Sequence, residues 1–189
     1  MGPSAYFYRM NLIQDIREYR RIDLPRLHQE VEYYKNRLSS LVAIQQAALG
    51  HTPVGNQVMI NPHQRRPPKG SKPIAMKALT EIQEDLLNVA SFEELFLMIK
   101  DVKDGVNGVG PLWAYDTALR IGWYLNLYPN QVFIHAGAKQ GAKILLETNC
   151  VGMENLGRYV SLHEFPKELH SLAPFEVENF LCLWNKAHK

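Results

Sequence analysis

The chain has 189 residues, of which 46% are hydrophobic, and a formal net charge of +2. This length is sufficient for one hydrophobic core, so we expect a single domain over residues 1–189. The small net charge excludes a chain that is basic throughout, so any contact with nucleic acid has to come from a local basic patch.

Features of secreted and membrane proteins are missing from the sequence. No apolar run approaches the roughly 20 residues of a membrane-spanning helix, and the first residues lack the regions of a signal peptide. The two cysteines, Cys150 and Cys182, show neither a disulfide framework nor a metal-binding spacing. We therefore expect a cytoplasmic protein with reduced thiols and no membrane partner.

Apolar residues recur with a helical period along most of the chain, which predicts an all-α domain of about seven helices. The first helix is expected at about Tyr6–Arg21. The second is expected to begin after Asp23, a capping residue, and to continue to about Leu49, where Gly50 ends it. Later helices are expected at about Ile74–Val89, at Phe92–Lys103 with Ser91 and Glu94 as a capping box, from Ala136 to before Gly152, and from about Pro174 onwards.

Residues 50–73, GHTPVGNQVMINPHQRRPPKGSKP, are rich in Gly and Pro and predict a long irregular basic loop. Its cationic side chains are Arg65, Arg66, Lys69 and Lys72. One interpretation is a solvated loop. The other is an arm that contacts phosphate through the planar forks of the arginines, with His63 and Gln64 directed into a site.

The stretch NGVGPLWAYDTALRIG, residues 107–122, joins two predicted helices through a Gly-x-Gly. Gly108 and Gly110 can take up positive φ and let the backbone approach a ligand closely, and Pro111 suits the first turn of the second helix. Unpaired amides at that helix start favour an anion, so Gly108, Val109 and Gly110 are candidate phosphate contacts. The alternative is a tight helix–helix turn without a ligand.

These residues, with VFIHAG after them, resemble the hairpin region of the helix-hairpin-helix DNA glycosylase superfamily over about Phe92–Leu146, with the hairpin motif itself at about 92–126. The segments HQRR, YDTALRIGWYLNLYPNQVFIHAGAKQGAKIL and LCLW also resemble an uncharacterised family of bacterial hypothetical proteins. The first resemblance implies a glycosylase-like helical fold, DNA binding and a role in DNA repair. It also implies a catalytic lysine and a catalytic aspartate, but Leu112 and the segment of His135 stand at those positions. Leucine cannot form a Schiff base, so standard base excision is not implied.

The predicted second hairpin helix places Trp113, Asp116, Arg120 and Trp123 on one face. One interpretation is an exposed Asp116–Arg120 ion pair over packed aromatic rings. The other is a pocket wall in which Asp116 is a base or accepts a hydrogen bond from a nucleobase. The side chains expected around such a pocket are Trp113, Tyr115, Arg120 and Gln64.

The stretch HAGAKQGAK is a second candidate phosphate site, formed by a helix start with Lys139 and Lys143 one turn apart. The alternative is a histidine, His135, that only caps the helix, beside two solvated lysines. No His, Cys or carboxylate spacing predicts a metal site, and no cofactor motif is present in the sequence.

Together these patterns favour a DNA-binding helix-hairpin-helix protein that recognises a damaged or modified base, with DNA or a nucleotide as its partner. One alternative is a divergent glycosylase or nucleotide hydrolase. Its candidate catalytic residues are Asp116, His135 and His63. A second alternative is a protein–protein adaptor anchored by Trp113 and Trp123.

Overall fold

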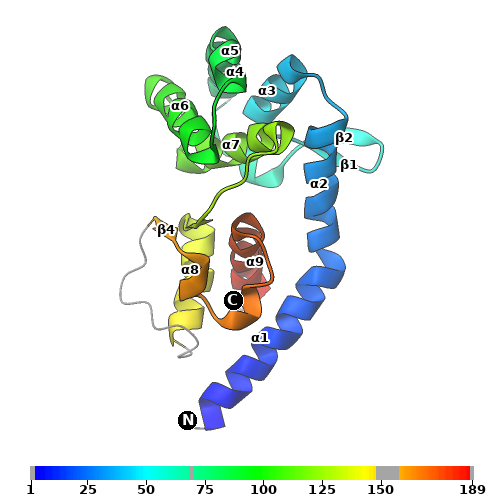
Figure 1. Ribbon diagram of the computed structural model, residues 1–189, viewed down its shortest axis with the longest axis vertical. Helices are drawn as coiled ribbons and strands as arrows, with labels where there is room; N and C mark the ends of the chain where they lie inside the picture. The colour runs from blue at the N-terminus through cyan, green and yellow to red at the C-terminus, as the bar shows by residue number, and fades with distance from the viewer. Residues whose placement is uncertain (1–2, 69, 148–157, 188–189) are drawn as a thin grey trace. The chain divides into compact units, whose positions relative to one another are not determined.

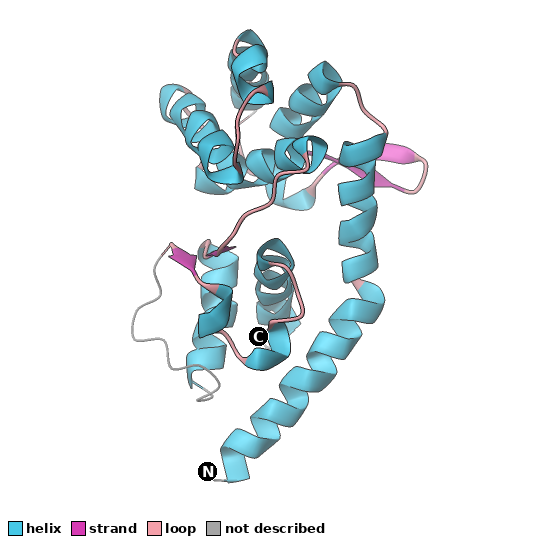
Figure 2. Ribbon diagram, in the orientation of Figure 1, coloured by secondary structure: helices cyan, strands magenta, loops and turns pink. Residues whose placement is uncertain are grey.

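The computed structural model describes residues 3–68, 70–147 and 158–187. These residues form nine α-helices and two antiparallel sheets of two strands each (Figures 1 and 2). The chain is therefore mostly helical, as predicted, but not purely α. By contacts it divides into two compact units, unit 1 with Met1–Leu27 and Pro129–Lys189, and unit 2 with His28–Tyr128. The expectation of one domain over the whole chain stays a prediction.

Unit 2 is arranged around one central helix. Its elements are most of α2 (Leu24–Asn36), α3 (Ser40–Leu49), β1 (His51–Val54), β2 (Gln57–Ile60), the 3₁₀ turn η1 (Pro62–Arg65), α4 (Ser71–Glu81), α5 (Gln83–Leu87), α6 (Phe92–Gly105) and α7 (Pro111–Leu125). Helices α3 and α6 pack against α7. Nearly every residue of α7 from Trp113 to Trp123 is buried, because neighbours cover it on several sides.

Two of the predicted helices are broken. The helix expected from Asp23 to Leu49 is interrupted before Ser40, where Ser39 has extended backbone angles and precedes α3. The helix expected at Ile74–Val89 begins earlier, at Ser71, and is divided at Ile82. Gly50 ends α3 with φ +74°, as predicted, because glycine tolerates this left-handed conformation.

The segment predicted as an irregular loop over 50–73 contains regular structure. Strands β1 and β2 pair in register, with Val54 opposite Gln57, so that Gly55 and Asn56 form a two-residue turn. Gly55 has φ +60°, as the first central residue of a type II′ hairpin turn requires. The strands escaped prediction because four residues are too few for a clear alternation of apolar and polar side chains.

Unit 1 is formed by both ends of the chain. Its elements are α1 (Pro3–Ile22), β3 (Val132–Phe133), α8 (Ala136–Glu147), β4 (Tyr159–Val160), the 3₁₀ turns η2 (Leu162–Glu164) and η3 (Lys167–Leu169), and α9 (Pro174–Ala187). Helices α8 and α9 lie side by side (Figure 1). A Cβ on Gly141 would clash with the backbone oxygen of Leu181, so this glycine permits the close approach of the two helices.

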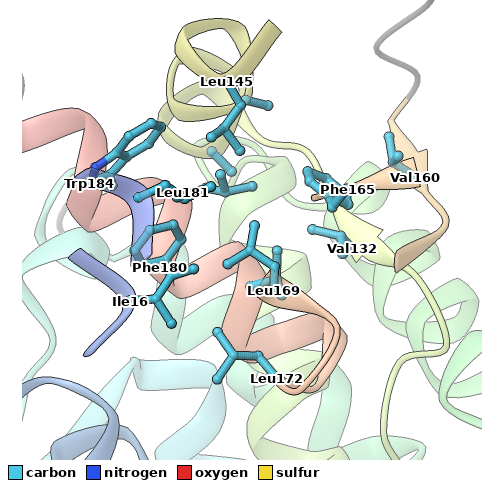
Figure 3. Packing of buried hydrophobic residues seen from close by; sticks show 14 of the residues in the cluster. Ile16, Val132, Leu145, Val160, Phe165, Leu169, Leu172, Phe180, Leu181 and Trp184 are labelled. Atoms are coloured by element: carbon cyan, nitrogen blue, oxygen red, sulfur yellow. The ribbon is translucent and has the colours of Figure 1, made fainter. Parts of the chain in front are cut away.

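The core of unit 1 combines residues from distant parts of the sequence. Figure 3 shows Ile16 of α1, Leu145 of α8 and Phe180 of α9 among the side chains of one buried cluster. Burial of such apolar surface is the main favourable term in folding, and it holds the N-terminal helix on the C-terminal segment. None of the described helices is both long and apolar enough to cross a membrane.

Candidate functional site

The turn between α6 and α7 has the positive φ that its sequence allows at Gly108 but not at Gly110, where φ is −115°. Ser91 caps α6 by accepting a hydrogen bond from the Glu94 amide at 3.1 Å. Gly108 has φ +92°, a value that favours glycine. Val106 and Val109, on either side of Gly108, are buried and anchor the turn to unit 2. The turn is therefore held by packing and by one glycine conformation.

Two residues that follow η1, Pro68 and Ser71, lie against this turn. A Cβ on Gly108 would clash with Oγ of Ser71 and lie 3.1 Å from Cδ of Pro68. Pro68 and Ser71 therefore cover one side of Gly108. Arg65 and Arg66, a few residues earlier in the chain, are both exposed. Two exposed guanidinium groups thus precede the segment that contacts the turn.

Gly110 leaves the other side of the turn open. It is the residue before α7, with φ −115°, and no side chain caps the helix start there. A Cβ added at Gly110 would meet no atom within 4 Å. Amide groups in the first turn of a helix attract anions, and phosphate binding at this end of α7 stays a prediction.

Gln64 and Asp116 are brought together, although 52 residues separate them. Nε2 of Gln64 donates a hydrogen bond to Oδ2 of Asp116, and Gln64 is 1% exposed. Lys72 holds the same segment in place, because its Nζ donates to the backbone oxygens of Leu49 at 2.8 Å and Gln64 at 2.9 Å. Burial lowers the pKa of Lys72, and the charge of Arg120 adds to this effect. The side chain of His63 and all of Lys69 lie outside the described residues.

The side chains expected to line a pocket on α7 have protein partners. Nε1 of Trp113 donates to the backbone oxygen of Ala48 at 2.8 Å, and the ring of Tyr115 packs against Phe92 and Phe96. Trp113 and Trp123 are 2% and 3% exposed, which removes the surface anchor that the adaptor hypothesis requires. A role for Trp113, Tyr115, Arg120 and Gln64 in binding a base stays a prediction.

The exposed ion pair that we considered for Arg120 is not present, because Arg120 is buried. Its Nε lies 2.8 Å from Oε1 of Glu30, and its Nη1 donates to the backbone oxygen of Asp116 at 3.2 Å. Burial lowers the pKa of Arg120, but the charges of Glu30 and its neighbours outweigh burial and raise it. Glu30 was not predicted as a partner of Arg120. The only sequence feature that could have indicated it is the position of its carboxylate next to Val31, on the inner stripe of a helix.

The residues predicted as the second phosphate site belong to unit 1. Lys139 and Lys143 are exposed on α8. Nδ1 of His135 accepts a hydrogen bond from the Gly137 amide at 3.1 Å, so this histidine caps α8, as the plainer interpretation predicted. His135 lies in unit 1 and Asp116 in unit 2, so a catalytic site that combines them stays a prediction.

No protein-family model matches this chain, and neither the curated proteins nor the solved structures contain a significant match. In the described part of the chain, no three His, Cys, Asp or Glu side chains are placed so that they could hold a metal ion.

Proposed function

We propose that unit 2 binds the phosphate backbone of DNA through the turn between α6 and α7. The observation that carries the proposal is the contact of Pro68 with Gly108. This contact supports the proposal because the exposed Arg66 and Arg65 stand two and three residues before Pro68, and no side chain caps the start of α7. Cationic side chains and helix-start amides are both groups with which proteins contact phosphate.

Each part of this surface has a separate role. The amides at the start of α7, on the side of Gly110, donate short-range hydrogen bonds to one phosphate, which the helix dipole also attracts. The guanidinium groups of Arg65 and Arg66 neutralise further phosphates and release counterions from the DNA. Such contacts position a duplex without reading its sequence. Asp116 already accepts a hydrogen bond from the buried Gln64, so we assign it a structural role in place of the general-base role.

Two substitutions of Gly110 test the helix start. Aspartate is a favourable residue before a helix, so Gly110→Asp should fold, but its carboxylate competes with phosphate for the same amides. Gly110→Ala is the matched control, because the position is open and φ is ordinary for alanine. In fluorescence anisotropy with a short DNA duplex at low salt, we expect Gly110→Asp to bind at least about tenfold more weakly than Gly110→Ala, or about 1.4 kcal/mol.

The arginines are tested by the salt dependence of binding. The double variant Arg65→Gln, Arg66→Gln should make the slope of log K against log salt concentration shallower by about 1.8, since each phosphate contact contributes about 0.9. Unaltered protein that fails to bind duplex at low salt contradicts the proposal. So does a Gly110→Asp variant that binds as well as Gly110→Ala.

A further inference from the structure

The start of α8 and the middle of α9 bring a histidine, a glutamate and a cysteine together. Nε2 of His135 contacts Oε1 of Glu178, and the side chain of Cys182 is a hydrogen-bond partner of His135. Cys182 follows Glu178 by four residues on α9, so both side chains lie on the same face of that helix. The order of contacts is carboxylate, imidazole, thiol.

The two ring nitrogens of His135 have different partners. The amide of Gly137 donates to Nδ1, which identifies Nδ1 as the nitrogen with the lone pair and Nε2 as the nitrogen that donates to Glu178. Burial lowers the pKa of His135, but the hydrogen bonds to Cys182 and Glu178 outweigh burial and raise it. His135 is therefore a stronger base than an ordinary imidazole, with its proton-accepting nitrogen on the side away from the carboxylate.

Gly137 shows how closely the thiol and the ring lie to the start of α8. A Cβ on Gly137 would lie 2.9 Å from Sγ of Cys182 and 3.0 Å from Cε1 of His135. Sγ is thus next to the second residue of α8, where the helix dipole stabilises negative charge. The residue at 137 has to be small for the sulfur and the ring to occupy these positions.

We propose that Cys182 is a nucleophilic cysteine, that His135 is its base and that Glu178 positions and stabilises the imidazole. A nucleophile in reach of a base that a third group orients is the general arrangement of activated nucleophiles. Cys182 is 5% exposed, and the Glu178 carboxylate lies beyond the ring. The site therefore takes small electrophiles without negative charge.

The reaction can be written with iodoacetamide as the probe. The thiol proton of Cys182 moves to Nδ1 of His135, which gives up its hydrogen bond from the Gly137 amide, and the sulfur forms a bond to the methylene carbon. The carbon–iodine bond breaks, iodide leaves with the electron pair, and His135 releases its proton to solvent. The product is a stable thioether on Cys182.

The first test needs no variant. Protein is labelled with iodoacetamide at pH 7, once folded and once in urea, and the modified peptides are quantified by mass spectrometry. The peptide of Cys150, which lies outside the described residues, is counted separately. We expect Cys182 to react at least about tenfold faster in the folded protein than in the unfolded chain, and more slowly with the anionic iodoacetate. Slower labelling in the folded protein shows a thiol that is merely buried and overturns the proposal.

Variants then assign the roles. His135→Asn should lower the folded-state labelling rate by about tenfold or more. The control is His163→Asn, since His163 is an exposed histidine of the same unit and should leave the rate unchanged. Glu178→Gln still accepts a hydrogen bond from Nε2, so it should retain more of the rate than Glu178→Ala. Equal rates for His135→Asn and His163→Asn overturn the proposal. If circular dichroism shows that His135→Asn is unfolded, the proposal is tested by the labelling rates of Cys182 in the folded and the urea-unfolded unaltered protein.

Discussion

Among the described residues, each unit contains a buried ion pair that joins two helices, and the two pairs differ in one respect that decides their chemistry. In unit 2, Arg120 of α7 pairs with Glu30 of α2, with side chains 4% and 11% exposed. In unit 1, His135 at the start of α8 pairs with Glu178 of α9, with side chains 8% and 11% exposed. Burial and the carboxylate partner are thus nearly the same.

The two pairs differ in the residue that can carry the positive charge, which is an arginine in unit 2 and a histidine in unit 1. An arginine keeps its proton at every accessible pH, so the Arg120–Glu30 pair only holds helices together. A histidine can lose its proton within the accessible pH range, and His135, with a pKa raised to about 10, has a thiol as its further neighbour. A buried ion pair is therefore weak evidence for a functional site unless one member can give or take a proton.

The largest effect is expected from removing one charge of the arginine pair. Arg120→Met leaves Glu30 buried without its partner and should lower the free energy of unfolding by about 3–5 kcal/mol. The double variant Glu30→Leu, Arg120→Met should recover most of this loss, since apolar residues replace buried pairs well. Urea unfolding measures both, and a double variant no more stable than the single one contradicts the structural role.

The histidine pair should make stability depend on pH. Because the pKa of His135 is raised in the folded state, its contribution is fully present below the ordinary value of 6.5 and is lost as the pH rises through the folded-state value of about 10. A pKa difference of one between the folded and unfolded states corresponds to about 1.4 kcal/mol. Between pH 6 and about pH 10, the free energy of unfolding in urea should fall more steeply for the unaltered protein than for Glu178→Gln. Parallel plots of this free energy against pH for the two proteins would rule the effect out.

Two glycine substitutions in the α6–α7 turn test the packing of unit 2, whereas the Arg120 variants test its buried charges. Gly108→Ala forces alanine into positive φ and against Ser71 and Pro68, so it should cost about 1–3 kcal/mol of stability. Gly110→Ala has open space and ordinary φ and should change stability by at most about 0.5 kcal/mol. Thermal unfolding of the two variants compares them, and equal losses would show that the turn is not held against Pro68 and Ser71.

The smallest effect is expected from the thiol. Cys182→Ala removes one small buried group and should cost about 1 kcal/mol in urea unfolding. A loss as large as that of Arg120→Met would make Cys182 a structural residue and would remove the contrast between the two units.

Local features of this chain could be predicted from its sequence. The start of α7 at Pro111, the cap of α6 by Ser91, the end of α3 at Gly50 and the positive φ of Gly108 were predicted correctly. Each depends on the backbone preferences or hydrogen bonds of a few neighbouring residues. The interruption before Ser40 and the strands β1 and β2 were missed, because weak local signals do not determine short elements.

The partners of the polar side chains were decided by the tertiary structure. Glu30 and Arg120 are 90 residues apart, and His135 and Glu178 are 43 apart. The sequence identified Arg120 and His135 as chemically important. It did not predict that Glu30 and Glu178 would be their partners. Periodicity shows which face of a helix is buried, whereas the pairing of two helices follows from packing over the whole unit, which no short stretch of sequence contains.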